Sequence, residues 1–283
     1  MDAGLSAQGA ILAASIGYKG WFVPSHPNHK VRGLDGALWD GLYWGYFMLA
    51  TILVFITIVV LSLPAAAIFI PYTLLTGNVN PLYVVGSWIA RTAMRVAGIR
   101  VQLEGMESLP TGRACIFMAN HVSNLDAPAL ISNLPGRSTV FLKRALMKLP
   151  ILGYGFKLGG FIPVARDGNV ENARRAVELA QKALESGLHI TIFVEGTRSR
   201  DGRMLAFKKG PFHLAMASGA PCIPVSIYGT EKIIPRGSNR IFPGTAHVVF
   251  HPAIDPAGYA TREELSNAVR GAIAGGLPEW MRS

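Results

Sequence analysis

The sequence is poor in charge and in cysteine. Only 16% of its 283 residues are charged and 50% are hydrophobic, whereas charged residues make up about 25% of an ordinary soluble domain. This composition favours contact with a membrane. The two cysteines, Cys115 and Cys222, both lie in apolar runs, which is typical of buried, reduced thiols. Because no cluster of cysteines and histidines accompanies them, no metal site is expected.

Several motifs that would define other classes of protein are missing. The first 18 residues have no basic region, so they do not resemble a cleaved signal peptide. No G-x-x-x-x-G-K-[ST] motif supports nucleotide hydrolysis, and no G-x-S-x-G motif supports a serine hydrolase. No nucleic-acid-binding motif is present, so nucleic acid is not an expected partner. Residues 1–40 are interpreted as an N-terminal extension without an assigned function.

Positive charge is confined to the second part of the chain. Residues 1–90 contain three basic and three acidic residues, so the formal net charge of +10 belongs entirely to residues 91–283. A basic surface near a bilayer suits anionic lipids or phosphorylated ligands.

No charged residue lies between Asp40 and Arg91. At about 1.5 Å per residue, a helix over residues 41–63 would be about 35 Å long, enough to cross a hydrocarbon core of about 30 Å. Pro64 and Pro71 are expected to break or kink the chain after it. Two topologies are open: the helix crosses the membrane once, or residues 41–90 form a re-entrant helical hairpin.

Residues 84–98 have the pattern of an amphipathic helix, which would either lie on the membrane surface or pack its apolar side on the following domain. Arg91, Arg95 and Arg100 follow the apolar segment. If the chain crosses once, these arginines place the following domain on the cytosolic face of the cell membrane. Residues 41–98 are therefore interpreted as membrane-embedded and interfacial helices.

Strands and helices alternate in residues 99–283, which are interpreted as the catalytic domain. Helical periodicity over residues 170–184, a proline at 211 with a glycine at 219, and a capping box at Thr261 predict three helices. Seven segments have the pattern of strands: 99–103, 114–119, 139–142, 161–164, 190–194, 222–228 and 247–250. The alternation predicts an α/β domain with a mainly parallel or mixed sheet flanked by helices, on an N-terminal membrane-embedded helical anchor.

Two polar runs, residues 120–126 and 195–201, each follow a predicted strand. In parallel sheets, ligands bind beyond the carboxyl ends of the strands. If the two strands are parallel, both polar runs meet at one edge of the sheet.

His121 and Asp126 are the parts of a general-base pair. A neutral imidazole is suited to accepting a proton near pH 7, and a carboxylate that accepts from Nδ1–H fixes its tautomer. His121 can instead be a structural loop residue, and Asp126 can cap the helix that follows it. The capping and catalytic roles of Asp126 can coexist, because a carboxylate has several acceptor sites.

Three further features carry positive charge toward the same edge. In the run that begins at Glu195, small residues allow close approach of backbone, and Arg198 can hold a phosphate through paired donors. Arg166, at the end of a predicted strand, can bind an anionic headgroup, and Lys143 and Lys208 can extend the positive field. The alternatives are a polar turn and ordinary surface charges.

Together these runs resemble the glycerolipid acyltransferase family, and within it the 1-acyl-glycerol-3-phosphate acyltransferases. Four blocks occur in the family's order over residues 80–260: Asn120-His121-x-x-x-x-Asp126, residues 160–166, Phe193-Val194-Glu195-Gly196-Thr197-Arg198-Ser199, and Ile223-Pro224-Val225. Two positions depart from the pattern. Val194 stands where proline is usual, and Ala165 stands where aspartate or asparagine is common.

The resemblance implies transfer of a fatty acyl chain from a thioester, on acyl-CoA or acyl carrier protein, to the hydroxyl of lysophosphatidic acid. It implies direct transfer in the membrane without cofactor, metal or covalent acyl-enzyme. His121 and Asp126 would be catalytic. The implied substrate-binding residues are Arg166, Glu195, Gly196, Thr197, Arg198, Lys143 and Lys208. Two alternatives are open: another acceptor, such as a lyso-ornithine lipid or lysophospholipid, or a membrane-tethered lipid-binding protein without activity.

Overall fold

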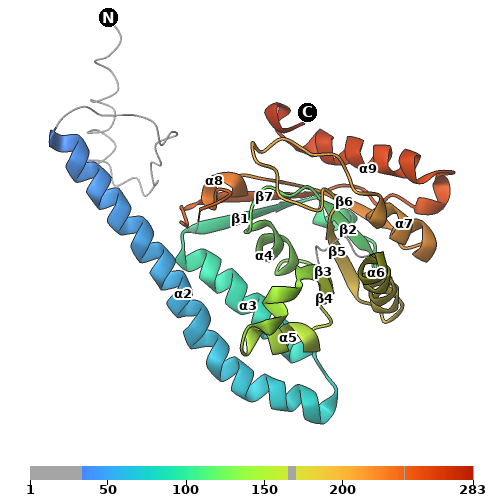
Figure 1. The fold of residues 1–283 in the computed structure, drawn as a ribbon, viewed down its shortest axis with the longest axis horizontal. Helices are drawn as coiled ribbons and strands as arrows, with labels where there is room; N and C mark the ends of the chain where they lie inside the picture. Colours follow the sequence, from blue (N-terminus) through green and yellow to red (C-terminus); the bar gives the residue numbers. More distant parts are fainter. Residues whose placement is uncertain (1–33, 165–169, 239, 283) are drawn as a thin grey trace, which may run out of the picture. The chain divides into compact units, whose positions relative to one another are not determined.

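A computed structural model describes residues 34–164, 170–238 and 240–282. Most of the predicted N-terminal extension and the predicted phosphate ligand Arg166 lie outside the described residues. The chain divides into two compact units, residues 1–44 and 45–283. The sheet, the helices that cover it and the candidate site all belong to the second unit (Figure 1).

Helix α2 (Leu34–Thr76) continues through both Pro64 and Pro71, so the expectation that these prolines break the helix is wrong. Each proline removes one backbone donor, but the remaining hydrogen bonds of a long apolar helix hold it together, as in membrane-spanning helices. The part from Met48 to Thr76 is 29 residues long, and it is the one described helix that is long and apolar enough to cross a membrane.

Helix α3 (Asn80–Val96) confirms the predicted amphipathic helix. Ile89, Ala93 and Met94 are buried, and α3 packs against helix α4 and strand β1. Its buried side therefore faces the α/β domain, as one of the two alternatives had it. Val84 and Trp88 remain exposed.

Seven strands form one mixed sheet in the order β1-β7-β6-β2-β5-β3-β4. Their bounds are β1 Ile99–Glu104, β2 Ile116–Ala119, β3 Ser138–Lys143, β4 Ile162–Val164, β5 His189–Phe193, β6 Cys222–Tyr228 and β7 Gly244–Phe250. Every neighbouring pair is parallel except β6 and β7. The carboxyl ends of β6, β2, β5, β3 and β4 therefore share one edge, which is called the carboxyl edge below.

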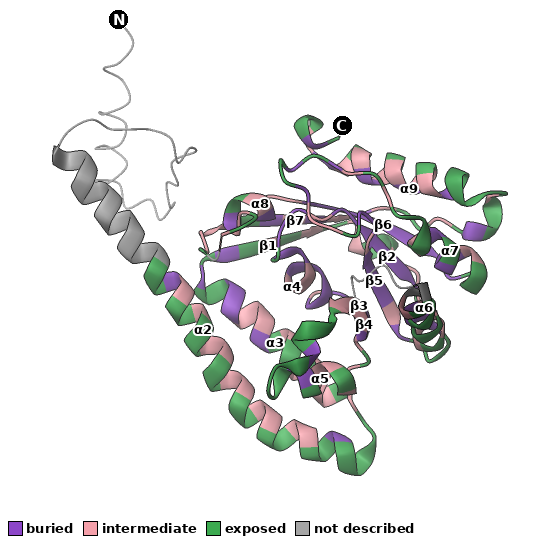
Figure 2. Cartoon of the chain, in the orientation of Figure 1, coloured by how far each residue is buried: buried purple, intermediate pink, exposed green. Residues whose placement is uncertain are grey.

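Apolar side chains on both faces of the sheet form two core clusters (Figure 2). Alternation along β2 sends Ile116 and Met118 into one cluster and Phe117 and Ala119 into the other. The first cluster contains residues of α6 (Val170–Glu185), α7 (Lys209–Ser218) and α9 (Arg262–Gly276). The second contains residues of α3, α4 (Asp126–Ile131) and α8 (Thr230–Ile233). Helix α5 (Leu152–Leu158) lies between β3 and β4 in the chain.

Candidate active site

The predicted pair forms where β2 ends at the carboxyl edge. The chain leaves β2 at Ala119, turns through residues 120–125 and enters α4 at Asp126. His121 Nδ1 lies 2.7 Å from Asp126 Oδ2, and the two side chains are 16% and 0% exposed. A partly accessible imidazole is thus held by a fully buried carboxyl group.

Asp126 accepts hydrogen bonds from four donors. Oδ2 accepts from the backbone amides of Val122 and Ser123, at 2.7 and 2.8 Å, as well as from His121. Oδ1 accepts from the hydroxyl of Thr230 at 2.5 Å. An ionised carboxylate only accepts, so the imidazole proton stays on Nδ1 and the lone pair on Nε2 is available to remove a proton from a substrate. Asp126 therefore binds amides that precede it, rather than acting as the N-cap considered above.

Thr230, which follows strand β6, completes this network. It is fully buried and begins α8, directly after Gly229 at the end of β6. Gly229 has φ +86°, and a Cβ at this position would lie 2.4 Å from the carbonyl oxygen of Thr245. The turn therefore requires glycine, and it places the Thr230 hydroxyl against Asp126 because β6 pairs with β2.

Replacement of Thr230 by valine is expected to lower kcat about tenfold, because a hydrogen bond to a charged group is worth roughly 1.5–3 kcal/mol. Thr230 acts through Asp126 and does not reach substrate, so the KM for the acceptor should stay unchanged. The Thr230→Ser variant keeps the hydroxyl and should retain near-normal kcat. Steady-state kinetics of both variants test this, and wild-type kcat in Thr230→Val would contradict it.

The His121 ring and backbone are held by the strand and loop of β5. The imidazole stacks on Phe193, with ring centroids 4.0 Å apart and planes 20° apart. The amide of Ser199 donates to the carbonyl of His121 at 2.8 Å. Both contacts follow from the parallel register, which sets Ala119 beside Phe193. The predicted meeting of residues 120–126 and 195–201 at one edge is confirmed.

Glu195 lies beneath the His121 loop and is 1% exposed. Its Oε1 accepts from the His121 amide at 3.1 Å, while its Oε2 has no hydrogen-bond partner among the described residues. Burial raises the pKa of Glu195 to about 7, against the opposing effect of backbone hydrogen bonds. This carboxyl group supports the loop that carries the base.

Glu195 makes stability depend on pH. In the folded chain the pKa of Glu195 is about 7, whereas in an unfolded chain the pKa of a glutamate is about 4.3. Each unit of this pKa difference changes the free energy of unfolding by about 1.4 kcal/mol. Between these values the folded state binds more protons, so rising pH should destabilise wild type by roughly 3 kcal/mol relative to Glu195→Gln. Unfolding in detergent at pH 4.5 and 7.5 measures this, and equal pH dependence in the two proteins would contradict it.

The other predicted residues also lie at the carboxyl edge, except Arg166, which is outside the described residues. Gly196 has φ +68°, and the Lys208 side chain lies against it. Thr197 and Arg198 are partly exposed, and Lys143 ends β3. The carbonyl of Arg198 accepts from Arg236 at 2.5 Å.

Three residues that hold the site were missed by sequence reasoning: Thr230, Phe193 as a ring partner, and Arg236. Each acts across strands or loops that are far apart in sequence. Thr230 lies two residues after the predicted strand 222–228, and this position at a strand end is the one sequence feature that indicated a place near the site.

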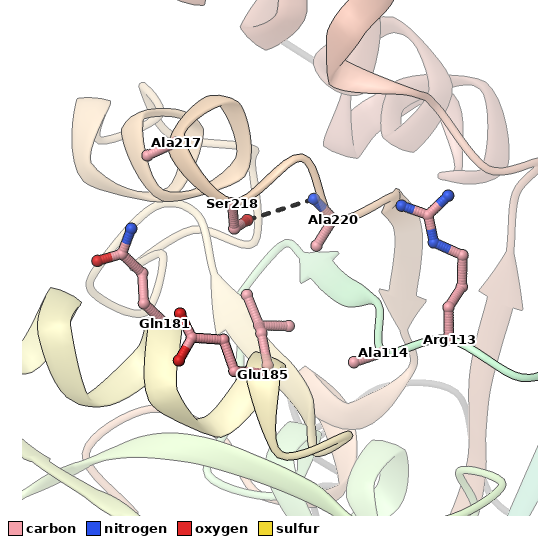
Figure 3. A pocket seen from close by; sticks show the side chains of 8 residues that line it. Arg113, Ala114, Gln181, Glu185, Ala217, Ser218 and Ala220 are labelled. Atoms are coloured by element: carbon pink, nitrogen blue, oxygen red, sulfur yellow. Dashed lines mark hydrogen bonds between the residues drawn. The ribbon is translucent and has the colours of Figure 1, made fainter.

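A cavity of about 280 Å³ lies at the opposite edge of the sheet, away from this site (Figure 3). Its lining includes Arg113 and Ala114, which precede β2, and Gln181 and Glu185 on α6. The Ser218 hydroxyl, at the end of α7, accepts from the amide of Ala220 at 3.3 Å. These residues are at the amino ends of the strands, so this cavity is not part of the candidate site.

Part of the chain is similar to a known protein family. Residues 100–228 match the family model described as Acyltransferase. The matched segment contains His121, Asp126 and the loop after β5, and the match ends at Tyr228, two residues before Thr230.

Several curated proteins that are similar to this chain are named as 1-acyl-sn-glycerol-3-phosphate acyltransferases, and one similar solved structure is named as a 1-acyl-sn-glycerophosphate acyltransferase. A chloroplastic 1-acyl-sn-glycerol-3-phosphate acyltransferase of Brassica napus is 35% identical to this chain, over 59% of this chain's length and 47% of the length of the Brassica protein. The alpha form of that enzyme from Homo sapiens is 30% identical over 57% of each chain. The crystal structure of the acyltransferase PlsC of Thermotoga maritima has a TM-score of 0.73 at 27% identity, covering 83% of this chain and 95% of that one. The chain spans about half the length of the chloroplastic relatives.

Proposed function

We propose that this chain transfers a fatty acyl group from an acyl thioester to the free hydroxyl of 1-acyl-glycerol-3-phosphate, which gives phosphatidic acid. The observation that carries this proposal is the hydrogen bond of 2.7 Å between His121 Nδ1 and buried Asp126, at the edge where the Glu195 to Arg198 loop also lies. The names of the relatives and of the structural neighbour support the acceptor.

The pair supports a direct displacement. His121 Nε2 removes the proton of the acceptor hydroxyl as its oxygen attacks the thioester carbonyl carbon. The tetrahedral intermediate then expels the thiolate, which accepts the proton from the imidazolium. Asp126 stabilises the imidazolium while it exists. The balanced products are one ester and one thiol, and no acyl group is held on the protein.

Basic side chains at the carboxyl edge suit a phosphorylated acceptor. Arg198, Lys208 and Lys143 lie on three different elements around the base, and Arg166 follows β4 in the sequence. Guanidinium groups bind phosphate through two parallel hydrogen bonds, and ammonium groups bind it as point charges. We propose that these residues bind the phosphate of the acceptor. The proposed acyl donor is acyl-CoA or acyl carrier protein.

The setting proposed for the reaction is the membrane. Helix α2 is the proposed anchor, and if it crosses the membrane once, the arginines that follow it favour a cytosolic position for the acyltransferase domain by the positive-inside rule. The acceptor and product are both lipids, so a domain held at the bilayer meets them where they reside.

A panel of lysolipid acceptors with one thioester tests the proposed acceptor. Purified full-length chain in vesicles is supplied with lysophosphatidic acid, lysophosphatidylcholine or lyso-ornithine lipid, and the acylated products are measured by mass spectrometry. We expect lysophosphatidic acid to react with the highest kcat/KM. Higher kcat/KM for an acceptor without a terminal phosphate would overturn the assignment, and no lysolipid-dependent thiol release would indicate a binding protein without activity.

A further inference from the structure

A second exposed apolar surface lies between β3 and β4, on a short helical hairpin. It consists of the 3₁₀ turn Arg144–Lys148, a tight turn at residues 149–151, and α5; it is called the 144–158 hairpin. Its outer side presents apolar side chains that are 39–43% exposed: Leu146, Leu149, Ile151, Leu152 and Tyr154. Five large apolar side chains within nine residues are thus exposed, and such a concentration of exposed apolar groups usually marks an interaction surface.

The hairpin is built so that these side chains point outward. Met147 and Gly153 are buried on its inner side, and a Cβ on Gly153 would lie 2.4 Å from the carbonyl oxygen of Met147. The two halves of the hairpin are thus in backbone contact through Gly153. The close approach of the two halves at Gly153 leaves the apolar side chains on the outer side of the hairpin.

The tip of the hairpin is strained. Ile151 has φ +62° and ψ −62°, and the amide of Leu152 donates to the carbonyl of Pro150 at 2.6 Å, which is a γ-turn of the rare, unfavourable hand. Ile151 is the one residue other than glycine with positive φ in the described parts of the chain. A β-branched side chain rarely adopts this conformation, and such strain gathers at functional sites.

Along the sequence, the charge in and beside the hairpin has one sign. No aspartate or glutamate occurs from Ala127 to Arg166. Arg144, Lys148 and Lys157 within the hairpin are all exposed. Apolar side chains flanked only by cations match a bilayer leaflet with anionic headgroups, where the apolar groups enter the acyl boundary and the cations meet phosphates.

We propose that the 144–158 hairpin docks on an anionic bilayer leaflet, as a membrane contact separate from helix α2. The hairpin follows the carboxyl end of β3, which is joined to β2 through the parallel strand β5. Docking therefore presents the carboxyl edge, where His121 lies, to the lipid surface. The chain also carries a helix that is long and apolar enough to cross a membrane, which would hold the hairpin near such a surface. The inference does not rest on the proposed reaction.

The test is a depth measurement in the full-length chain, in vesicles of phosphatidylcholine and phosphatidylglycerol. A bimane fluorophore is attached to Leu149→Cys and, as a control, to Glu263→Cys at the exposed start of α9, well apart from α5 (Figure 1). Cys115 and Cys222 are 1% and 0% exposed, so the folded chain reacts at the introduced thiol. Quenching by nitroxide-labelled lipid and by aqueous iodide is then compared.

The bimane at position 149 should be quenched several-fold more by nitroxide lipid than the one at 263, with the order reversed for iodide. Adding Lys148→Glu and Lys157→Glu should reduce the lipid quenching at 149, because the leaflet is anionic. Equal iodide quenching at both sites would show that the hairpin faces water and would overturn the proposal. Shielding of position 149 from both quenchers would also overturn it, because a second copy or another protein would then cover the surface. The readout needs no turnover, so an inactive enzyme leaves it intact.

Discussion

Replacing His121 by alanine should lower acyl transfer to lysophosphatidic acid by roughly 10²–10⁴-fold, the contribution of a positioned general base. The loss should fall on kcat, because the ring removes a proton in the transition state and is not assigned to the acceptor phosphate. Steady-state transfer from a thioester to lysophosphatidic acid measures it, and near-normal transfer by His121→Ala would remove His121 from the mechanism.

The His121→Ala variant is expected to fold. The contacts of this loop with Glu195 and Ser199 use the amide and carbonyl of residue 121, and both remain in the variant. The change loses the stacking on Phe193, which is worth about 0.5–1.5 kcal/mol for a ring pair, and the hydrogen bond from Nδ1 to Asp126, whose carboxyl group keeps its three other donors. A melting temperature close to that of wild type separates lost chemistry from lost structure.

Asp126 should respond differently to two substitutions. In Asp126→Asn, the amides of Val122 and Ser123 require the side-chain oxygen at the Oδ2 position, because both amides can only donate. That oxygen still accepts from His121 Nδ1, and the new amino group can donate to the Thr230 hydroxyl. The tautomer of His121 is kept and only the charge is lost, so kcat should fall about 10²-fold, the effect of roughly 3 kcal/mol.

This expected loss is smaller than the approximately 10⁴-fold effect of the equivalent change in a serine-protease triad, where the tautomer is reversed. Asp126→Ala should reduce activity at least as far as His121→Ala and also destabilise the fold, because two buried amides lose their acceptor. Kinetics and thermal unfolding of both variants decide between these expectations. Equal losses in Asp126→Asn and Asp126→Ala would show that charge, not orientation, is the whole role of Asp126.

The seven strands could be predicted from sequence because each is a short apolar run that ends in polar or glycine-rich residues. The His121 and Asp126 pair could be predicted because both members lie in one loop, five residues apart. The path of α2 could not be predicted from sequence. A proline shows that one backbone donor is missing, but it does not show whether the surrounding helix tolerates the loss. Helix α2 tolerates it at both Pro64 and Pro71.

The support of the site depends on contacts that no local pattern encodes. Thr230 reaches Asp126 only because β6 lies beside β2, and Glu195 is buried only because β5 lies on the other side of β2. Glu195 was expected at the substrate, as a polar residue in a polar run, but its carboxyl group bonds to the His121 amide. Strand order decides which polar residues face substrate and which support those that do.

The most direct test of the proposed reaction is to measure thiol release and phosphatidic acid formation together, in one reaction. Full-length chain in vesicles is given lysophosphatidic acid with acyl-CoA or with acyl carrier protein loaded with the same chain. The predicted result is one phosphatidic acid per thiol from at least one donor, dependent on lysophosphatidic acid and lost in His121→Ala. Thiol release without phosphatidic acid, or no transfer from either thioester, would contradict it.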